Sequence, residues 1–125
     1  VRVLPRLLRA LEEGFALLVD ARGRLLREEL VSEGSLLESV VTPREAFRAA
    51  VREAAAGVVF VHNHPSGDPS PSREDVDLTR RLAEASRVLG VRFLDHVIVA
   101  REGYYSFAEE RGASPDGGAQ GKGNG

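Results

Sequence analysis

The feature that most constrains the fold is a short apolar run that ends in a histidine pair and leads through a stiff turn into a capped helix. Residues 58–62, VVFVH, have the length and character of a buried strand. The turn that follows contains three prolines, which fix the backbone φ angle, and Gly67, which allows a positive one. A helix is then expected from Ser72 to Leu89, with Gly90 as its stop. The sequence therefore predicts a strand and a helix joined by a rigid connection.

The remaining elements follow from hydrophobic periodicity and capping residues. Strands are expected at residues 15–20, 25–32, 91–100 and 104–107, and helices from Leu4 to about Glu12 and from Thr42 to Gly57. The first two strands are expected to pair as a hairpin. The glycine-dominated tail, residues 112–125, is expected to be disordered. Residues 1–111 are thus predicted to form one α/β domain, with a mixed sheet of about five strands flanked by helices.

Composition excludes several kinds of function. The net charge is −2 with acidic and basic residues interspersed, which does not favour non-specific nucleic-acid binding. No cysteine is present, so any metal would need histidine and carboxylate ligands. The absence of a long apolar run or a signal peptide predicts a cytoplasmic protein without a membrane partner. Because the sequence contains no methionine, even at position 1, we expect either a piece of a longer protein or a processed start.

The histidine pair has the spacing of a metal site. Residues i and i+2 of a strand project from one face with Cα atoms about 6.6 Å apart, so His62 and His64 can share an ion. Asp75 falls at the third helical position after Ser72, where main-chain N–H groups keep a carboxylate ionised. Two imidazoles and one carboxylate leave a position for water, as in catalytic zinc sites. Ser-x-x-Asp is also an ordinary capping box, but capping does not explain the histidines.

These residues resemble a known family. The stretch HNHPSGDPSPSRED, residues 62–75, fits the His-x-His-x7-Ser-x-x-Asp signature of JAMM (JAB/MPN) metalloprotease domains, and its wording is similar to that of the bacterial RadC family. The resemblance covers about residues 10 to 108 and implies a JAB/MPN architecture of the cytidine-deaminase-like kind. Full-length RadC proteins usually carry an N-terminal segment of helix-hairpin-helix character, which this sequence lacks.

The resemblance implies roles for single residues. His62, His64 and Asp75 would ligate Zn²⁺, and the Ser72 hydroxyl would stabilise the oxyanion. Glu13, before the first strand, would be the general base that takes a proton from water and returns it to the leaving amine. Glu12 and Glu33 stay open as alternatives for that base.

Other polar residues near the motif have structural interpretations. Asn63 is expected to hydrogen bond within the motif loop. Asp68 either orients a ligand histidine or forms the turn. His96 follows Asp95 on a strand, and we expect a buried, hydrogen-bonded pair outside the metal shell.

The resulting hypothesis is a zinc-dependent metallohydrolase, by resemblance a peptidase or isopeptidase acting on a peptide or protein substrate. One alternative is a DNA-repair-associated RadC module, in which segments absent here would contact nucleic acid. Another is a non-catalytic protein-interaction domain, which the complete ligand set disfavours. A zinc deaminase is disfavoured because its cysteine pair is absent.

Overall fold

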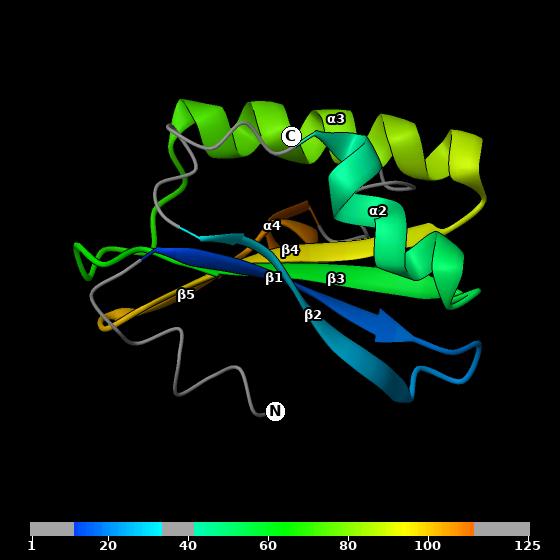
Figure 1. Cartoon of the computed structure of the whole chain (residues 1–125). Helices are drawn as coiled ribbons and strands as arrows, with labels where there is room; N and C mark the ends of the chain where they lie inside the picture. The colour runs from blue at the N-terminus through cyan, green and yellow to red at the C-terminus, as the bar shows by residue number, and fades with distance from the viewer. Residues whose placement is uncertain (1–11, 34–41, 112–125) are drawn as a thin grey trace.

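The computed structural model describes residues 12–33 and 42–111, which form a five-stranded sheet and three helices (Figure 1). In chain order the elements are β1 (Glu13–Val19), β2 (Leu25–Glu33), α2 (Pro43–Arg52), β3 (Gly57–Asn63), α3 (Arg73–Leu89), β4 (Arg92–Ala100), β5 (Gly103–Ser106) and α4 (Phe107–Arg111). The strand order is β2-β1-β3-β4-β5. The predicted α/β class with a five-stranded mixed sheet is confirmed.

The sheet places β3 at its centre. β1 pairs antiparallel with β2, which confirms the expected hairpin, and pairs antiparallel with β3 on its other edge. β3 and β4 run parallel and are joined through α3, because parallel neighbours need a crossover connection. β5 returns antiparallel to β4. The carboxyl end of β3, which carries the histidine pair, therefore lies between β1 and β4.

Helices α2 and α3 cover the same face of the sheet (Figure 1), and the main hydrophobic core lies beneath them. Phe47 of α2 meets Phe60 of β3 edge to face, with ring centroids 5.5 Å apart, and Phe60 meets Phe93 of β4 at 5.7 Å. A smaller apolar cluster around Phe15 and Val61 lies on the opposite face. Because side chains alternate along a strand, His62 projects to the same face as Phe60, the face covered by the helices.

Helix α3 has the ends predicted from the sequence. Ser72 is its N-cap: the hydroxyl oxygen accepts a hydrogen bond from the Asp75 N–H, while the Asp75 carboxylate accepts one from the Ser72 N–H. This is a complete capping box, which satisfies two main-chain donors that the helix itself leaves open. Gly90 ends the helix in the left-handed conformation, with φ of 73°.

Two element boundaries differ from the prediction. Helix α2 ends at Arg52 and not at Gly57, because Ala54 adopts a left-handed φ of 54° and the Ala56 N–H donates to the Val19 carbonyl of β1. Alanine favours helix, so pairing with β1 overrides the local preference here. Gly57 is the first residue of β3. At the end of the chain, Phe107 leaves the predicted last strand and begins α4, which was not predicted.

Other predictions fall outside the described residues. They are the helix expected from Leu4 to about Glu12 and the disordered tail. Of that helix only Glu12 is described, and it is not helical. Within residues 12–33 and 42–111, no helix combines the length and apolarity that crossing a bilayer requires.

The Phe47 contact predicts a large, local contribution to stability. Phe47→Ala should lower the free energy of unfolding by about 3–5 kcal/mol, because the side chain is 1% exposed and truncation leaves a cavity against Phe60. Urea unfolding monitored by circular dichroism measures the change. Val51→Ala on the same helix, where the side chain is 54% exposed, is the control and should change stability by no more than about 0.5 kcal/mol. Equal losses in the two variants would contradict the proposed packing of α2.

Candidate metal centre

The two histidines of the motif lie at the end of β3 with their rings close together. His62 is buried within the strand, and His64 continues the sheet by donating its main-chain N–H to the Val99 carbonyl of β4 at 3.0 Å. This bond keeps the backbone extended for one residue beyond β3, so the two rings stay on one face. Their centroids are 5.0 Å apart.

The turn after β3 orients His64. Its Nδ1 lies 3.0 Å from the main-chain carbonyl oxygen of Asp68, which can only accept a hydrogen bond, so Nδ1 carries the hydrogen. The Asp68 carboxylate accepts from the Ser70 N–H and shapes the turn. Both interpretations of Asp68 therefore hold, the first through its carbonyl and the second through its side chain. Nε2 of His64 is left to face the helix.

The carboxylate of Asp75 lies between the two imidazoles. Its Oδ1 is 3.2 Å from His62 Nε2, and its Oδ2 is 3.1 Å from His64 Nε2. The capping box fixes this position, because Oδ2 also accepts from the Ser72 N–H at 2.8 Å. The structure thus brings together all three of the ligands predicted from the sequence.

The surroundings lower the pKa of the Asp75 carboxyl and raise the pKa of the His64 imidazole. Burial acts to raise the pKa of the Asp75 carboxyl, but the two nearby imidazoles and the Ser72 N–H outweigh it and hold that pKa well below its usual range. The hydrogen bond to Asp75 raises the pKa of His64, against the effect of burial. Asp75 is therefore ionised at neutral pH and attracts a positive charge to the space beside it.

The donor atoms fit a divalent cation. His62 Nε2 is buried and has no hydrogen-bond partner among the described residues, although Asp75 Oδ1 is only 3.2 Å away. Two ligands about 2.0–2.1 Å from a tetrahedral zinc ion are about 3.3 Å apart, close to the observed 3.1 and 3.2 Å. A cation bound to all three groups would satisfy the buried nitrogen of His62 and complete the donor set.

The glutamate beside the histidines is Glu12. Its Oε2 lies 3.9 Å from His62 Nε2, and Glu12, His62 and His64 offer ligand atoms that all lie within 4.8 Å of one another. In the β1–β3 register Gly14 is opposite His62, so alternation turns Glu12 to the face of the histidines and Glu13 to the other face. The Glu13 N–H donates to Asn63 Oδ1 at 2.7 Å, so Asn63 hydrogen bonds to the start of β1 and not within the motif loop as expected.

That Glu13 is the base stays a prediction, but the structure places its alternative, Glu12, beside the histidines. Glu33, the other alternative, is the partner of Glu13 across β1 and β2. Ser72 is exposed at the N-terminus of α3. Its hydroxyl serves as the N-cap there, so its position is explained by capping alone.

Exposure differs among the four side chains. Those of His62 and Asp75 are 3% and 4% exposed, whereas those of His64 and Glu12 are 16% and 19% exposed. The more exposed pair therefore forms the solvent side of the site.

His96 is buried and hydrogen bonded as expected: its main-chain N–H donates to the Asp95 carboxylate at 2.7 Å, whereas its ring has other partners. Its ring contacts His62 and Thr79 and stacks on Phe107 with centroids 5.0 Å apart. Burial lowers the pKa of His96 to about 3, and the neighbouring His62 acts in the same direction. The ring is therefore neutral at physiological pH.

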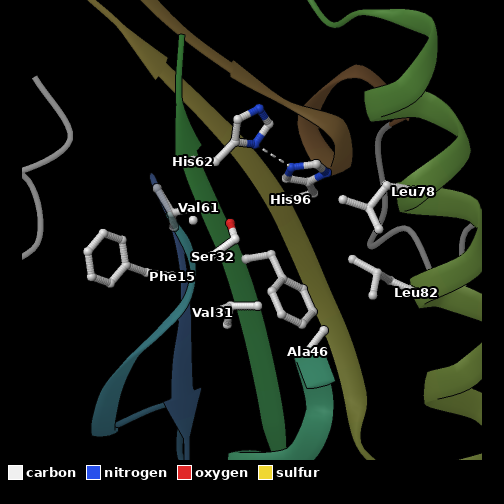
Figure 2. Close-up of a pocket in the computed structure, with 11 residues that line it drawn as sticks. Phe15, Val31, Ser32, Ala46, Val61, His62, Leu78, Leu82 and His96 are labelled. Atoms are coloured by element: carbon white, nitrogen blue, oxygen red, sulfur yellow. Dashed lines mark hydrogen bonds between the residues drawn. The ribbon is translucent and has the colours of Figure 1, made fainter. Parts of the chain in front are cut away.

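The sequence analysis missed Thr79. Its position four residues after Asp75 places both side chains on one face of α3, and that spacing was the signal available in the sequence. A pocket beside His62 and His96 is lined mainly by apolar side chains from the sheet, α2 and α3, among them Val31, Leu78 and Leu82 (Figure 2).

Comparison with known proteins agrees with this arrangement. Residues 2–113 match the family model described as RadC-like JAB domain. A UPF0758 protein of Syntrophotalea carbinolica is 60% identical over 98 residues, which are 78% of this chain and 43% of that protein. A UPF0758 protein of Geobacter sulfurreducens is 58% identical over 92 residues, 74% of this chain and 40% of that protein. One of Methanosarcina mazei is 48% identical over 99 residues, 79% of this chain and 43% of that protein.

The chain spans less than half the length of these curated relatives. The family match nevertheless covers nearly the whole chain and includes every residue of the candidate site. The chain belongs to the family of RadC-like JAB domains.

Proposed function

We propose that this domain is a zinc-dependent metallohydrolase that cleaves amide bonds in peptide or protein substrates, as a peptidase or isopeptidase. The observation that carries the proposal is the convergence of His62 Nε2, His64 Nε2 and the Asp75 carboxylate at 3.1–3.2 Å. Three nitrogen and oxygen ligands with an open fourth position are the donor set of catalytic zinc. All three are present, which counts against a purely structural interaction domain.

A divalent ion at this site would lower the pKa of a coordinated water towards about 7 and polarise the substrate carbonyl. Glu12 is the chain's own candidate for the proton transfers. Its carboxylate lies beside His62 on the solvent side of the site, where it would accept a proton from the attacking water and pass it to the leaving amine.

Ser72 is the candidate for stabilising the developing oxyanion. Its oxygen accepts the Asp75 N–H within the capping box, which leaves its hydroxyl hydrogen available to donate outward from the helix end. The same hydroxyl would thus position Asp75 and donate to the substrate oxygen.

Nothing in the charge distribution favours DNA as the substrate of this domain. The net charge is −2, with acidic and basic residues interspersed, which does not favour binding to a phosphate backbone. We therefore propose the hydrolase alone.

The ligand set predicts zinc binding that depends on Asp75. Wild-type protein dialysed against zinc should retain about one equivalent of Zn²⁺ by elemental analysis. Asp75→Asn should lose it while keeping the capping box, because the side-chain carbonyl oxygen of asparagine can still accept the Ser72 N–H. Asp77→Asn, which alters an exposed carboxylate two residues further along α3, is the control and should bind like wild type. Full zinc occupancy in Asp75→Asn, or in the His62→Ala, His64→Ala double variant, would refute the ligand assignment.

The register predicts which glutamate is the base. Glu12→Gln should lower kcat on a quenched fluorescent peptide library by about 10²–10⁴-fold while zinc content is unchanged. Glu13→Gln is the matched variant and should keep activity within a few-fold of wild type, because its side chain projects to the other face. Chelation should abolish hydrolysis and added zinc should restore it. Loss in Glu13→Gln with full activity in Glu12→Gln would reverse the assignment.

Comparing the N-caps of α2 and α3, Thr42 and Ser72, separates the capping role of Ser72 from its proposed role in catalysis. Ser72→Ala and Thr42→Ala each remove an N-cap hydroxyl, so each should lower the free energy of unfolding by about 1 kcal/mol. If Ser72 also stabilises the oxyanion, only Ser72→Ala should lower kcat, by about 10²–10³-fold. Stability is read from urea unfolding and kcat from peptide hydrolysis with zinc saturating. Equal activity in the two variants would confine Ser72 to capping.

A further inference from the structure

A buried chain of hydrogen bonds leads from His62 to the backbone of α3. Nδ1 of His62 lies 2.9 Å from Nε2 of His96, a contact drawn as a dashed line in Figure 2. Nδ1 of His96 lies 2.6 Å from the Thr79 hydroxyl, which donates to the Asp75 carbonyl oxygen at 2.8 Å. The chain therefore joins one candidate metal ligand to the main chain of another.

Hydrogen-bond counting fixes the direction of this chain. The Asp75 carbonyl can only accept, so the single hydrogen of the Thr79 hydroxyl points to it. Thr79 Oγ1 must then accept from His96, which places the hydrogen of His96 on Nδ1. Nε2 of neutral His96 accepts in turn from Nδ1 of His62. The lone pair of neutral His62 is left on Nε2, 3.2 Å from Asp75 Oδ1, so these two acceptors need a cation or a proton between them.

The reverse direction is disfavoured. If Thr79 donated to His96, the 2.8 Å contact between Thr79 Oγ1 and the Asp75 carbonyl would join two acceptors without a hydrogen. A doubly protonated His96 would place a charge on a ring that is 1% exposed and whose side-chain hydrogen-bond partners include no carboxylate.

The surroundings hold the His96 ring in this orientation. The ring stacks on Phe107 with an angle of 14° between the planes. Phe107 begins α4, and the Asp95 carboxylate accepts the Ala108 N–H at that helix start. Asp95 therefore helps to position the start of α4, and Phe107, the first residue of α4, packs against the His96 ring.

We infer that His96 and Thr79 are positioning residues that fix the tautomer of His62, so that its Nε2 lone pair is directed at the cation site. The inference rests on the proposed metal function. Without Thr79, His96 could turn its hydrogen towards His62 and so move the His62 hydrogen to Nε2, the atom that must bind the metal. Zinc binding would then have to reverse that arrangement and leave the Nδ1–H of His96 unsatisfied in a buried site.

The first test reads the tautomer in metal-free protein at pH 8, by long-range ¹H–¹⁵N spectra of the imidazoles. The chain has three histidines, so the spectrum can be assigned with single variants. Wild type should show hydrogen on Nδ1 of both His62 and His96. Thr79→Val should move hydrogen to Nε2 of His62 in part or in full, and Thr79→Ser, which restores the hydroxyl, should return the wild-type pattern. Hydrogen on Nε2 of His62 with none on its Nδ1 in wild type would overturn the inference.

The second test measures zinc affinity by competition with a chromophoric chelator. Thr79→Val and His96→Leu should each weaken zinc binding by about 10–100-fold, and Thr79→Ser should stay close to wild type. Ser86→Ala is the matched control, because it removes another buried hydroxyl of α3, one that donates to the Ala83 carbonyl. Unchanged affinity in Thr79→Val would overturn the inference even if wild type binds zinc.

The two hypotheses fail in different ways. If wild type binds no zinc, the proposed hydrolase fails, whereas the tautomer spectrum of the metal-free protein still decides whether Thr79 controls His62. A wild type that binds zinc with a Thr79→Val variant of equal affinity and unchanged tautomer leaves the hydrolase standing and removes the positioning role.

Discussion

The site depends on one carboxylate that belongs to two structures at once. Asp75 closes the capping box of α3 and also lies between the imidazoles of His62 and His64. The free N–H groups of a first helical turn favour an anion at this position, so the helix itself keeps the carboxylate ionised. Helix formation and assembly of the candidate site are therefore the same event, and a shift of the helix start would move the carboxylate away from both rings.

The sheet supplies the second half of the arrangement through register. Antiparallel pairing of β1 with β3 sets Gly14 opposite His62, and parallel pairing of β3 with β4 sets Ile98 opposite the same residue. The absence of a side chain at Gly14 matters, because a Cβ there would lie 2.8 Å from the buried hydroxyl of Ser32. Glycine at this position of β1 thus leaves room for the Ser32 side chain of the neighbouring strand β2.

Local patterns in the sequence predicted much of this structure, and long-range pairing decided the rest. Strand alternation placed His62 and His64 together, and the capping box placed Asp75, because both rules act within a few residues. Glu12 could not be separated from Glu13 in that way, since their faces are set by pairing with a strand about fifty residues later. Thr79 and His96 are 17 residues apart and meet only because α3 crosses back over the sheet.

The uneven exposure of the four central side chains gives the site a single direction of approach. His62 and Asp75 form its closed floor, while His64 and Glu12 form the rim that solvent reaches. A small ion or molecule that approaches from solvent would therefore meet His64 and Glu12 before it reaches the two buried side chains.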